Sequence, residues 1–254
     1  MKRLLVRCAR FQPCENANAR VSYMGKHGAV PVERAALEYY AGLGRDGLWA
    51  ENQYWWHIMA LLFWQVIFAR IPAVYSPQFG EFPNRFQDMP HDFFKRDFYT
   101  KRLTIIQKRM QELRNCTSIS KLIGDAYSAH MGEPCRPIED WNKYSLHDLC
   151  SGAENMTRDQ LLLIMDRLLV DFNSYRSGLP DLFFYQPDPL FVEVKSESDS
   201  IRNNQLDWLQ FLSSKVQVAA EVLLVNHQNH KTEAIRRLLE TRGFDVCVVG
   251  NSTQ

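Results

Sequence analysis

The chain has 254 residues, a formal net charge of +1 and 46% hydrophobic residues, a composition typical of a globular protein with a sizeable core. Near-neutrality excludes binding to nucleic acid through a strong overall field, so such binding would need local basic patches. The six cysteines are scattered, with no C-x-x-C pair and no zinc-finger spacing, and we expect reduced thiols in an intracellular protein. No apolar run is long enough to predict a signal peptide or a membrane segment.

The amino-terminal part of the sequence is expected to be mostly helical. Residues 1 to 30 are basic and mixed, and we expect no regular core element there. Residues 31 to 43 have helical spacing, with Glu33 in the first turn, where an acid favours the helix dipole. Residues 48 to 70 are apolar nearly all round, which predicts a central, buried helix with Glu51 near its start.

The middle of the chain combines a long loop with a basic helix. Residues 71 to 92 contain four prolines and several phenylalanines, and predict a loop-rich connection of the kind that is often functional or mobile. Residues 93 to 114 return to helical spacing. Basic residues recur on this helix seven positions apart, namely Lys101, Arg102, Lys108 and Arg109. This ridge either follows a DNA backbone or is a solvated helix face, and the sequence leaves both open.

The last hundred residues alternate apolar runs with amphipathic helices, which indicates an α/β class. One helix is expected at residues 156 to 172, with Thr157 as its N-cap. Another is expected to begin at a cap on Ser198 or Ser200. The remaining elements are a strand at 216–225, a helix at 231–242 and a final strand at 244–249. We therefore predict a mixed α/β fold with a large helical amino-terminal and inserted part.

The stretch from residue 178 to residue 205 carries the chemistry. Asp181 opens an apolar run, and a second run after a proline-containing break carries Glu193, Val194 and Lys195. Strand side chains alternate, so Glu193 and Lys195 share one face and Val194 points to the other. If the two runs pair as a hairpin, Asp181 approaches Glu193. Two carboxylates suit Mg²⁺ or Mn²⁺, and a lysine can handle a proton or a developing charge, as in a metal-dependent nuclease. Acids and lysines on strands are also common as solvated side chains, and the spacing alone leaves both interpretations open.

These motifs resemble a known nuclease superfamily. The P-D…E-x-K pattern is similar to the PD-(D/E)xK nucleases, and the wider string resembles their VRR-NUC branch. That string consists of G-L-P-D-L at residues 178 to 182, E-V-K at residues 193 to 195, Gln205 and Trp208. Helical segments at residues 32–40 and 61–68 resemble the Fanconi-anaemia-associated nuclease family, so the likeness runs from about residue 30 to about residue 225.

The resemblance implies a restriction-endonuclease-like mixed sheet flanked by helices. It implies an amino-terminal extension over residues 1–30 and a nuclease module over residues 31–254. Within the module, a helical insertion is expected at about 71–155 and an α/β core at about 156–250.

The resemblance also implies a role for each motif residue. One or two Mg²⁺ or Mn²⁺ ions would be bound by Asp181, Glu193 and the carbonyl oxygen of Val194, with Glu33 and Glu51 as further metal ligands. Lys195 would orient or activate the attacking water, and Gln205 would support the site. Family members are often basic around Ser200 and Asn204, where this chain is neutral, so Arg202 is expected to compensate. Arg176 and Arg202 join the basic ridge as candidate DNA contacts.

The activity that the resemblance implies is cleavage of DNA near 5′ flaps and trimming from the 5′ side, in repair of interstrand crosslinks. The expected partner is flap or branched DNA, and the helical insertion favours a monomer. A dimeric Holliday-junction resolvase and a non-catalytic DNA-binding module on a nuclease fold are the alternatives. The expected location is the nucleus in a eukaryote, or the cytoplasm and nucleoid in a bacterium.

Overall fold

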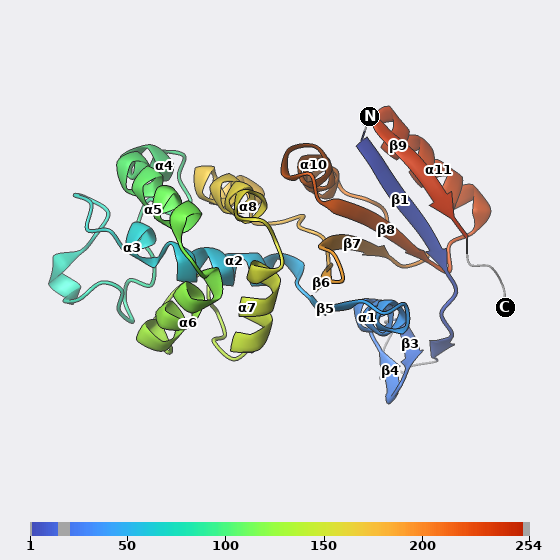
Figure 1. Ribbon diagram of the computed structural model, residues 1–254, viewed down its shortest axis with the longest axis horizontal. Helices are drawn as coiled ribbons and strands as arrows, with labels where there is room; N and C mark the ends of the chain where they lie inside the picture. The colour runs from blue at the N-terminus through green and yellow to red at the C-terminus, as the bar shows by residue number, and fades with distance from the viewer. Residues whose placement is uncertain (1, 15–20, 251–254) are drawn as a thin grey trace. The chain divides into compact units, whose positions relative to one another are not determined.

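The computed structural model describes residues 2–14 and 21–250. The chain divides into two compact units (Figure 1). An α/β unit comprises Met1–Glu51 and Gly178–Gln254, and a helical unit comprises Asn52–Ser177.

A mixed sheet forms the centre of the α/β unit (Figure 1). In order across the sheet, its six described strands are β5 (Asp46–Trp49), β6 (Leu182–Gln186), β7 (Leu190–Lys195), β8 (Ala219–Val225), β1 (Lys2–Ala9) and β9 (Phe244–Val249). Strand β6 is antiparallel to both β5 and β7, whereas β7, β8, β1 and β9 run parallel. A smaller antiparallel sheet holds β2 (Pro13–Cys14), β3 (Ser22–Gly25) and β4 (Gly28–Val30). The predicted mixed α/β fold is confirmed.

Strand β1 shows that the expectation of no core element in residues 1–30 was wrong. It lies between β8 and β9, and its Leu4 and Val6 are fully buried. Arg7 is not a tail residue either, because its guanidinium contacts Glu221 on β8, which is 214 residues away in sequence. A strand whose partners are so distant in sequence has no local signal for pairing. Its basic residues also interrupt the apolar run, so the run does not look like a buried strand.

Helices cover the two faces of this sheet. Helix α1 (Val32–Gly42) packs on the face that holds Val192 and Val194. Helix α10 (Asn203–Phe211) contributes a contact to the opposite face, where Glu193 lies, and continues as the π-helical turn η2 (Leu212–Val216). Helix α11 (Asn229–Thr241) follows β8. The predicted alternation of faces is therefore confirmed.

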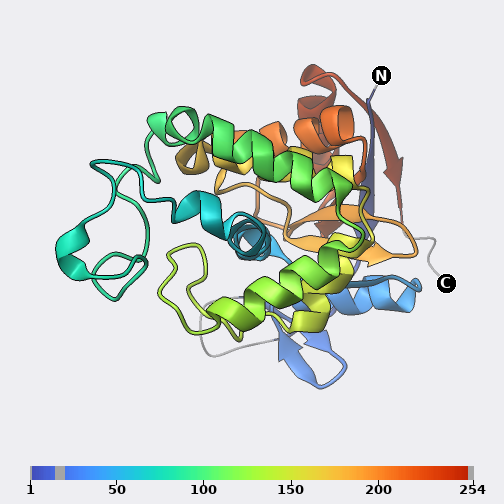
Figure 2. The same ribbon diagram turned by 60° about the vertical axis from the view of Figure 1, so that its left-hand side comes forward.

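The helical unit contains α2 (Glu51–Leu62), α3 (Trp64–Ile67), α4 (Asp97–Lys101), α5 (Leu103–Asn115), α6 (Ile119–His130), α7 (Leu146–Glu154), α8 (Arg158–Val170) and α9 (Phe172–Tyr175), with the short helix η1 (Pro77–Phe79). As predicted, α2 is buried along most of its length, and it lies between α5 and α8 on one side and α6 and α7 on the other (Figures 1 and 2). The expected cap of α8 is confirmed, because Thr157 forms a capping box with Gln160.

Two expected boundaries were wrong. The helix predicted at residues 48 to 70 loses its start to β5, in which Gly47 is required because a Cβ atom there would meet the carbonyl oxygen of Phe183 at 2.4 Å. Neither Ser198 nor Ser200 caps α10, whose first residue is Asn203. Across the described residues, no helix combines the length and apolar character that crossing a membrane requires.

Candidate active site

The predicted hairpin forms and brings Asp181 next to the second strand. Strands β6 and β7 are antiparallel, with Leu182 opposite Val192. Asp181 directly precedes β6, and its Oδ2 accepts a hydrogen bond of 2.8 Å from the backbone N–H of Val194. Since Val194 lies between Glu193 and Lys195, this bond fixes the Asp181 carboxylate beside both.

The glycine of the G-L-P-D motif allows α10 to approach the hairpin. Gly178 has a φ of +94°, in the region that favours glycine. A Cβ atom at this position would lie 2.7 Å from the backbone of Asn204, in the first turn of α10. A larger residue would therefore displace the start of α10, which carries Gln205.

A lysine, a glutamate and a glutamine form a closed polar cluster at the end of β7. The Nζ of Lys195 lies 2.7 Å from Oε1 of Glu193 and donates to Oε1 of Gln205 at 3.0 Å. Gln205 in turn donates from Nε2 to the same Glu193 oxygen at 2.5 Å. Glu193 is completely buried and Lys195 is 6% exposed. The three side chains named in the E-V-K and Gln signature thus meet as predicted.

Both carboxyl groups of the hairpin resist ionisation. Burial, opposed by the Val194 N–H and by Lys195, raises the pKa of Asp181 to about 6, and Glu33 and Glu51 add to the shift. Burial raises the pKa of Glu193 well above its ordinary value, and the neighbouring Asp181 carboxylate adds repulsion. Lys195 alone does not offset the repulsion that ionisation of both carboxyl groups would create. A cation would relieve it.

The two upstream glutamates predicted as metal ligands lie in the same electrostatic neighbourhood. Burial raises the pKa of Glu33, in the first turn of α1, and Glu51 and Asp199 raise it further. The N–H of Glu51 donates to the carbonyl oxygen of Asp181 at 2.9 Å, and Glu51 has a φ of +29°, which is uncommon for a non-glycine residue. The backbone therefore holds Glu51 next to Asp181.

The sequence reasoning missed Asp199. Its carboxylate accepts hydrogen bonds from the N–H of Ser196 at 2.9 Å and from the Ser196 hydroxyl at 2.5 Å, which folds the loop after Lys195. It is also close enough to raise the pKa of Glu33. The spacing S-x-x-D, typical of side-chain-capped turns, was the available signal.

The donor set fits a divalent cation. In the described parts of the chain, no three acidic, histidine or cysteine side chains converge closely enough to ligate one ion as they lie. However, Oε2 of Glu193 is buried without a hydrogen-bond partner, and every nearby acid carries a hard oxygen that suits Mg²⁺ or Mn²⁺. Asp181 and Glu193, with Glu33 and Glu51 beside them, are the residues that would hold such an ion. The Val194 carbonyl stays a predicted ligand.

The predicted basic ridge on α4 and α5 is not a continuous surface, and its assignment to DNA is wrong for Arg102. This side chain is fully buried, pairs with Asp92 at 2.8 Å and donates to the carbonyl oxygens of Val66 and Phe98. Heptad spacing could not reveal this, because Asp92 lies in the preceding irregular segment.

The other predicted DNA contacts differ in accessibility. Arg109 is half-buried, donates to the carbonyl oxygen of Leu62 and pairs with a neighbouring acid. Lys101 is exposed but pairs with Asp97 at 2.6 Å. The remaining three, which are Lys108, Arg176 and Arg202, are exposed. Arg176 also lies over the ring of Phe94.

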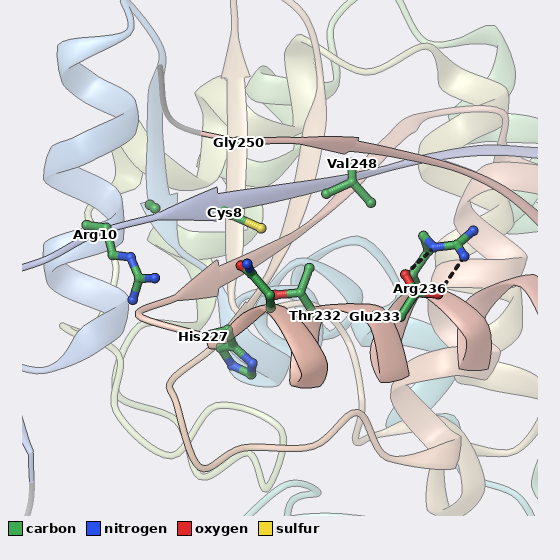
Figure 3. A pocket seen from close by; sticks show the side chains of 10 residues that line it. Cys8, Arg10, His227, Thr232, Glu233, Arg236, Val248 and Gly250 are labelled. Atoms are coloured by element: carbon green, nitrogen blue, oxygen red, sulfur yellow. Dashed lines mark hydrogen bonds and ion pairs between the residues drawn. The ribbon is translucent and has the colours of Figure 1, made fainter. Parts of the chain in front are cut away.

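A cavity of about 570 Å³ lies apart from these acids, between the ends of β1 and β9 and the first turns of α11 (Figure 3). Cys8, Arg10 and His227 are among its lining residues. His227 is connected to the active site, because its Nε2 donates to the carbonyl oxygen of Ser196, the residue after Lys195, at 2.6 Å. His227 therefore supports the catalytic loop, a role that the sequence did not indicate.

The acids, the lysine and the glutamine lie where the internal strand β7 ends, beside the residue that precedes β6. Comparisons with known proteins associate this part of the chain with nucleases. The pattern that defines the VRR-NUC domain matches residues 114–227. The chain is 29% identical over 208 residues to the Fanconi-associated nuclease 1 homolog of Oryza sativa, which covers 78% of this chain and 21% of the relative. It is 29% identical over 233 residues to the homolog of Schizosaccharomyces pombe, covering 90% of this chain and 32% of the relative.

A comparison with solved structures also finds similarity to this group of nucleases. A crystal structure of paFAN1 bound to DNA with a 1-nucleotide 5′ flap and a gap superposes with a TM-score of 0.71 at 27% identity, covering 90% of this chain and 38% of that one. Sequence and structure thus show similarity to VRR-NUC nucleases over a large part of the chain. The curated proteins it resembles are Fanconi-associated nuclease 1 proteins, as its motifs predicted, and the chain spans only about a fifth to a third of their length.

Proposed function

We propose that this chain is a metal-dependent, structure-specific deoxyribonuclease that hydrolyses phosphodiester bonds near 5′ flaps and trims DNA from the 5′ side. The observation that carries the proposal is the buried cluster of Asp181, Glu193 and Lys195, closed by Gln205. The flap preference is supported by the relatedness to paFAN1, whose solved structures contain 5′-flap DNA. With this activity we also propose a role in repair of interstrand crosslinks, as the family resemblance implies.

Each residue of the cluster has a separate role in the proposed hydrolysis. Asp181 and Glu193 would hold Mg²⁺ or Mn²⁺, with Glu33, Glu51 and the carbonyl oxygen of Val194 as further ligands. The bound metal supplies Lewis acidity, which favours a nucleophilic water and stabilises charge on the phosphate oxygens. Lys195 lies close enough to Glu193 to orient the attacking water, and Gln205 fixes the positions of both side chains. The products are a 5′-phosphate and a 3′-hydroxyl.

Accessible cations would position the DNA. Arg202, at the start of α10, lies next to Gln205 and stands in for the basic residues that relatives carry around Ser200 and Asn204. Arg176 and Lys108 are exposed on the helical unit. We propose that the enzyme acts as a monomer on flap or branched DNA inside the cell, in the nucleus or the nucleoid according to the host.

The test is a cleavage assay on matched 5′-flap, 3′-flap, nicked and four-way junction DNA with Mn²⁺ or Mg²⁺, combined with light scattering. We expect a monomer that cuts the 5′-flap substrate fastest. The variants Asp181→Ala and Lys195→Ala should lose cleavage and retain most DNA binding. Symmetrical cutting of junctions by a dimer would support a resolvase instead. Binding without cleavage by the wild-type protein in either metal would indicate a non-catalytic module.

A further inference from the structure

The helical unit displays two phenylalanine side chains for which the proposed active site has no use. Phe86 is 64% exposed and Phe79 is 43% exposed. Their ring centroids are 5.4 Å apart with an angle of 36° between the ring planes, so the pair forms one continuous aromatic surface. Single exposed apolar residues are ordinary, but paired exposed rings indicate a surface that binds something.

The loop that carries Phe86 is held in place by hydrogen bonds. Asn84 and Gln87 exchange two backbone bonds of 3.0 Å, which places Arg85 and Phe86 at the tip of a tight turn. Gln87 is 3% exposed, and its side chain donates to the carbonyl oxygen of Val74 at 2.8 Å and accepts from the N–H of Ser76 at 3.0 Å. A buried amide thus anchors the turn and keeps Phe86 in solvent.

Guanidinium groups accompany the rings. The guanidinium of Arg85 lies 4.6 Å from the centroid of Phe86, and that of Arg70 lies 5.3 Å from the centroid of Tyr75. Of the two acids between residues 71 and 90, Asp88 is paired with Arg136 at 3.0 Å and Glu81 is exposed. Aromatic faces beside cations complement a ligand that combines flat rings with negative charge, which describes nucleic acid.

We propose that Phe79 and Phe86 form a stacking platform for an unpaired base of the DNA substrate, with Arg85 contacting an adjacent phosphate. The choice of DNA as the ligand rests on the proposed nuclease function. Stacking on phenylalanine accepts any base because every base has a π-face, so the platform recognises single-stranded character without sequence preference. The platform would therefore add affinity for the unpaired part of a branched substrate.

The experiment measures binding in EDTA, so that it does not depend on cleavage. Two DNAs of the same duplex sequence are compared, one blunt and one with a single-stranded arm that contains 2-aminopurine. Phe86→Ala should weaken binding of the armed DNA by at least about fivefold and remove the quenching of 2-aminopurine that stacking causes. Binding of the blunt duplex should stay within about twofold, and Phe86→Trp should restore both signals.

Two further variants make the result specific. Met131→Ala, a change at another exposed apolar residue of the helical unit, should bind both DNAs as the wild type does. Arg85→Gln should lower the slope of log affinity against log salt by about one. Unchanged binding and quenching in Phe86→Ala would overturn the proposal and leave a protein surface as the occupant. Equal losses on both DNAs would also overturn it. If the wild type binds as expected in EDTA but does not cut DNA in a separate assay with Mn²⁺, the proposed catalytic function is refuted and the stacking platform is not.

Discussion

Replacing Asp181 by asparagine should stabilise the metal-free protein at neutral pH while abolishing its activity. An asparagine keeps the shape of the side chain and an oxygen that accepts from the N–H of Val194, but it carries no negative charge. Asp181 has its pKa raised from 3.8 to about 6, mainly by burial, and ionising it in the native state is therefore unfavourable.

The sign and size of this stability difference follow from the linkage between proton binding and folding. Because the native pKa is raised, the native state binds the proton more tightly, and the group's contribution to stability is present below pH 3.8 and is lost as the pH rises through 6. The loss is below about 1 kcal/mol at pH 4, about 2 kcal/mol at pH 5 and about 3 kcal/mol at pH 8. We expect Asp181→Asn to recover most of that loss at pH 8 and little at pH 4.

Urea unfolding in EDTA between pH 4 and pH 8 measures this difference. Asp207→Asn, a change at an exposed acid of α10, is the matched control and should follow the wild-type profile. Addition of Mg²⁺ or Mn²⁺ at pH 8 should stabilise the wild type more than Asp181→Asn, because the ion binds the native carboxylates. Parallel pH profiles for the wild type and Asp181→Asn would refute the reasoning, as would a variant that is less stable at pH 8.

Four other substitutions test the packing around the hairpin and within the helical unit. Gly178→Ala, at a φ of +94° and against the backbone of α10, should reduce stability by about 1–3 kcal/mol and lower cleavage with it, as measured by urea unfolding and by the flap assay. Tyr40→Phe removes a 2.6 Å hydrogen bond to the buried carboxylate of Glu221 and should cost about 1.5–3 kcal/mol in the same unfolding measurement. Arg102→Met leaves the buried Asp92 with only its longer ion pair to Lys101, at 3.9 Å, and should cost about 3–5 kcal/mol. Lys108→Ala on the surface should change stability by less than about 0.5 kcal/mol, and equal effects of these two variants would contradict the burial of Arg102.

The chemistry of the hairpin could be predicted because it depends on local rules. Alternation along one strand puts Glu193 and Lys195 on one face, and a short break between two apolar runs predicts a hairpin that returns to Asp181. Both features are present in the structure. The family resemblance supplied Gln205, which no periodicity pointed to.

Long-range pairings could not be predicted from the sequence. Strand β1 pairs with β8 and β9, which lie about two hundred residues later, and its basic residues resemble those of a solvated tail. Arg102 belongs to a helix with heptad-spaced cations, but its buried partner Asp92 comes from a segment without regular structure. Asp199 and His227 act on the loop after Lys195 through hydrogen bonds to Ser196, which only the folded chain brings together.

The most direct test of the central claim is single-turnover cleavage of 5′-flap DNA by the wild type and by Lys195→Met, with and without Mn²⁺. We expect cleavage by the wild type only when the metal is present. We also expect a loss of at least about a thousandfold in Lys195→Met, with the affinity for DNA nearly unchanged. Metal-independent cleavage, or a Lys195→Met variant that cuts as fast as the wild type, would contradict the assignment of this cluster as the catalytic site.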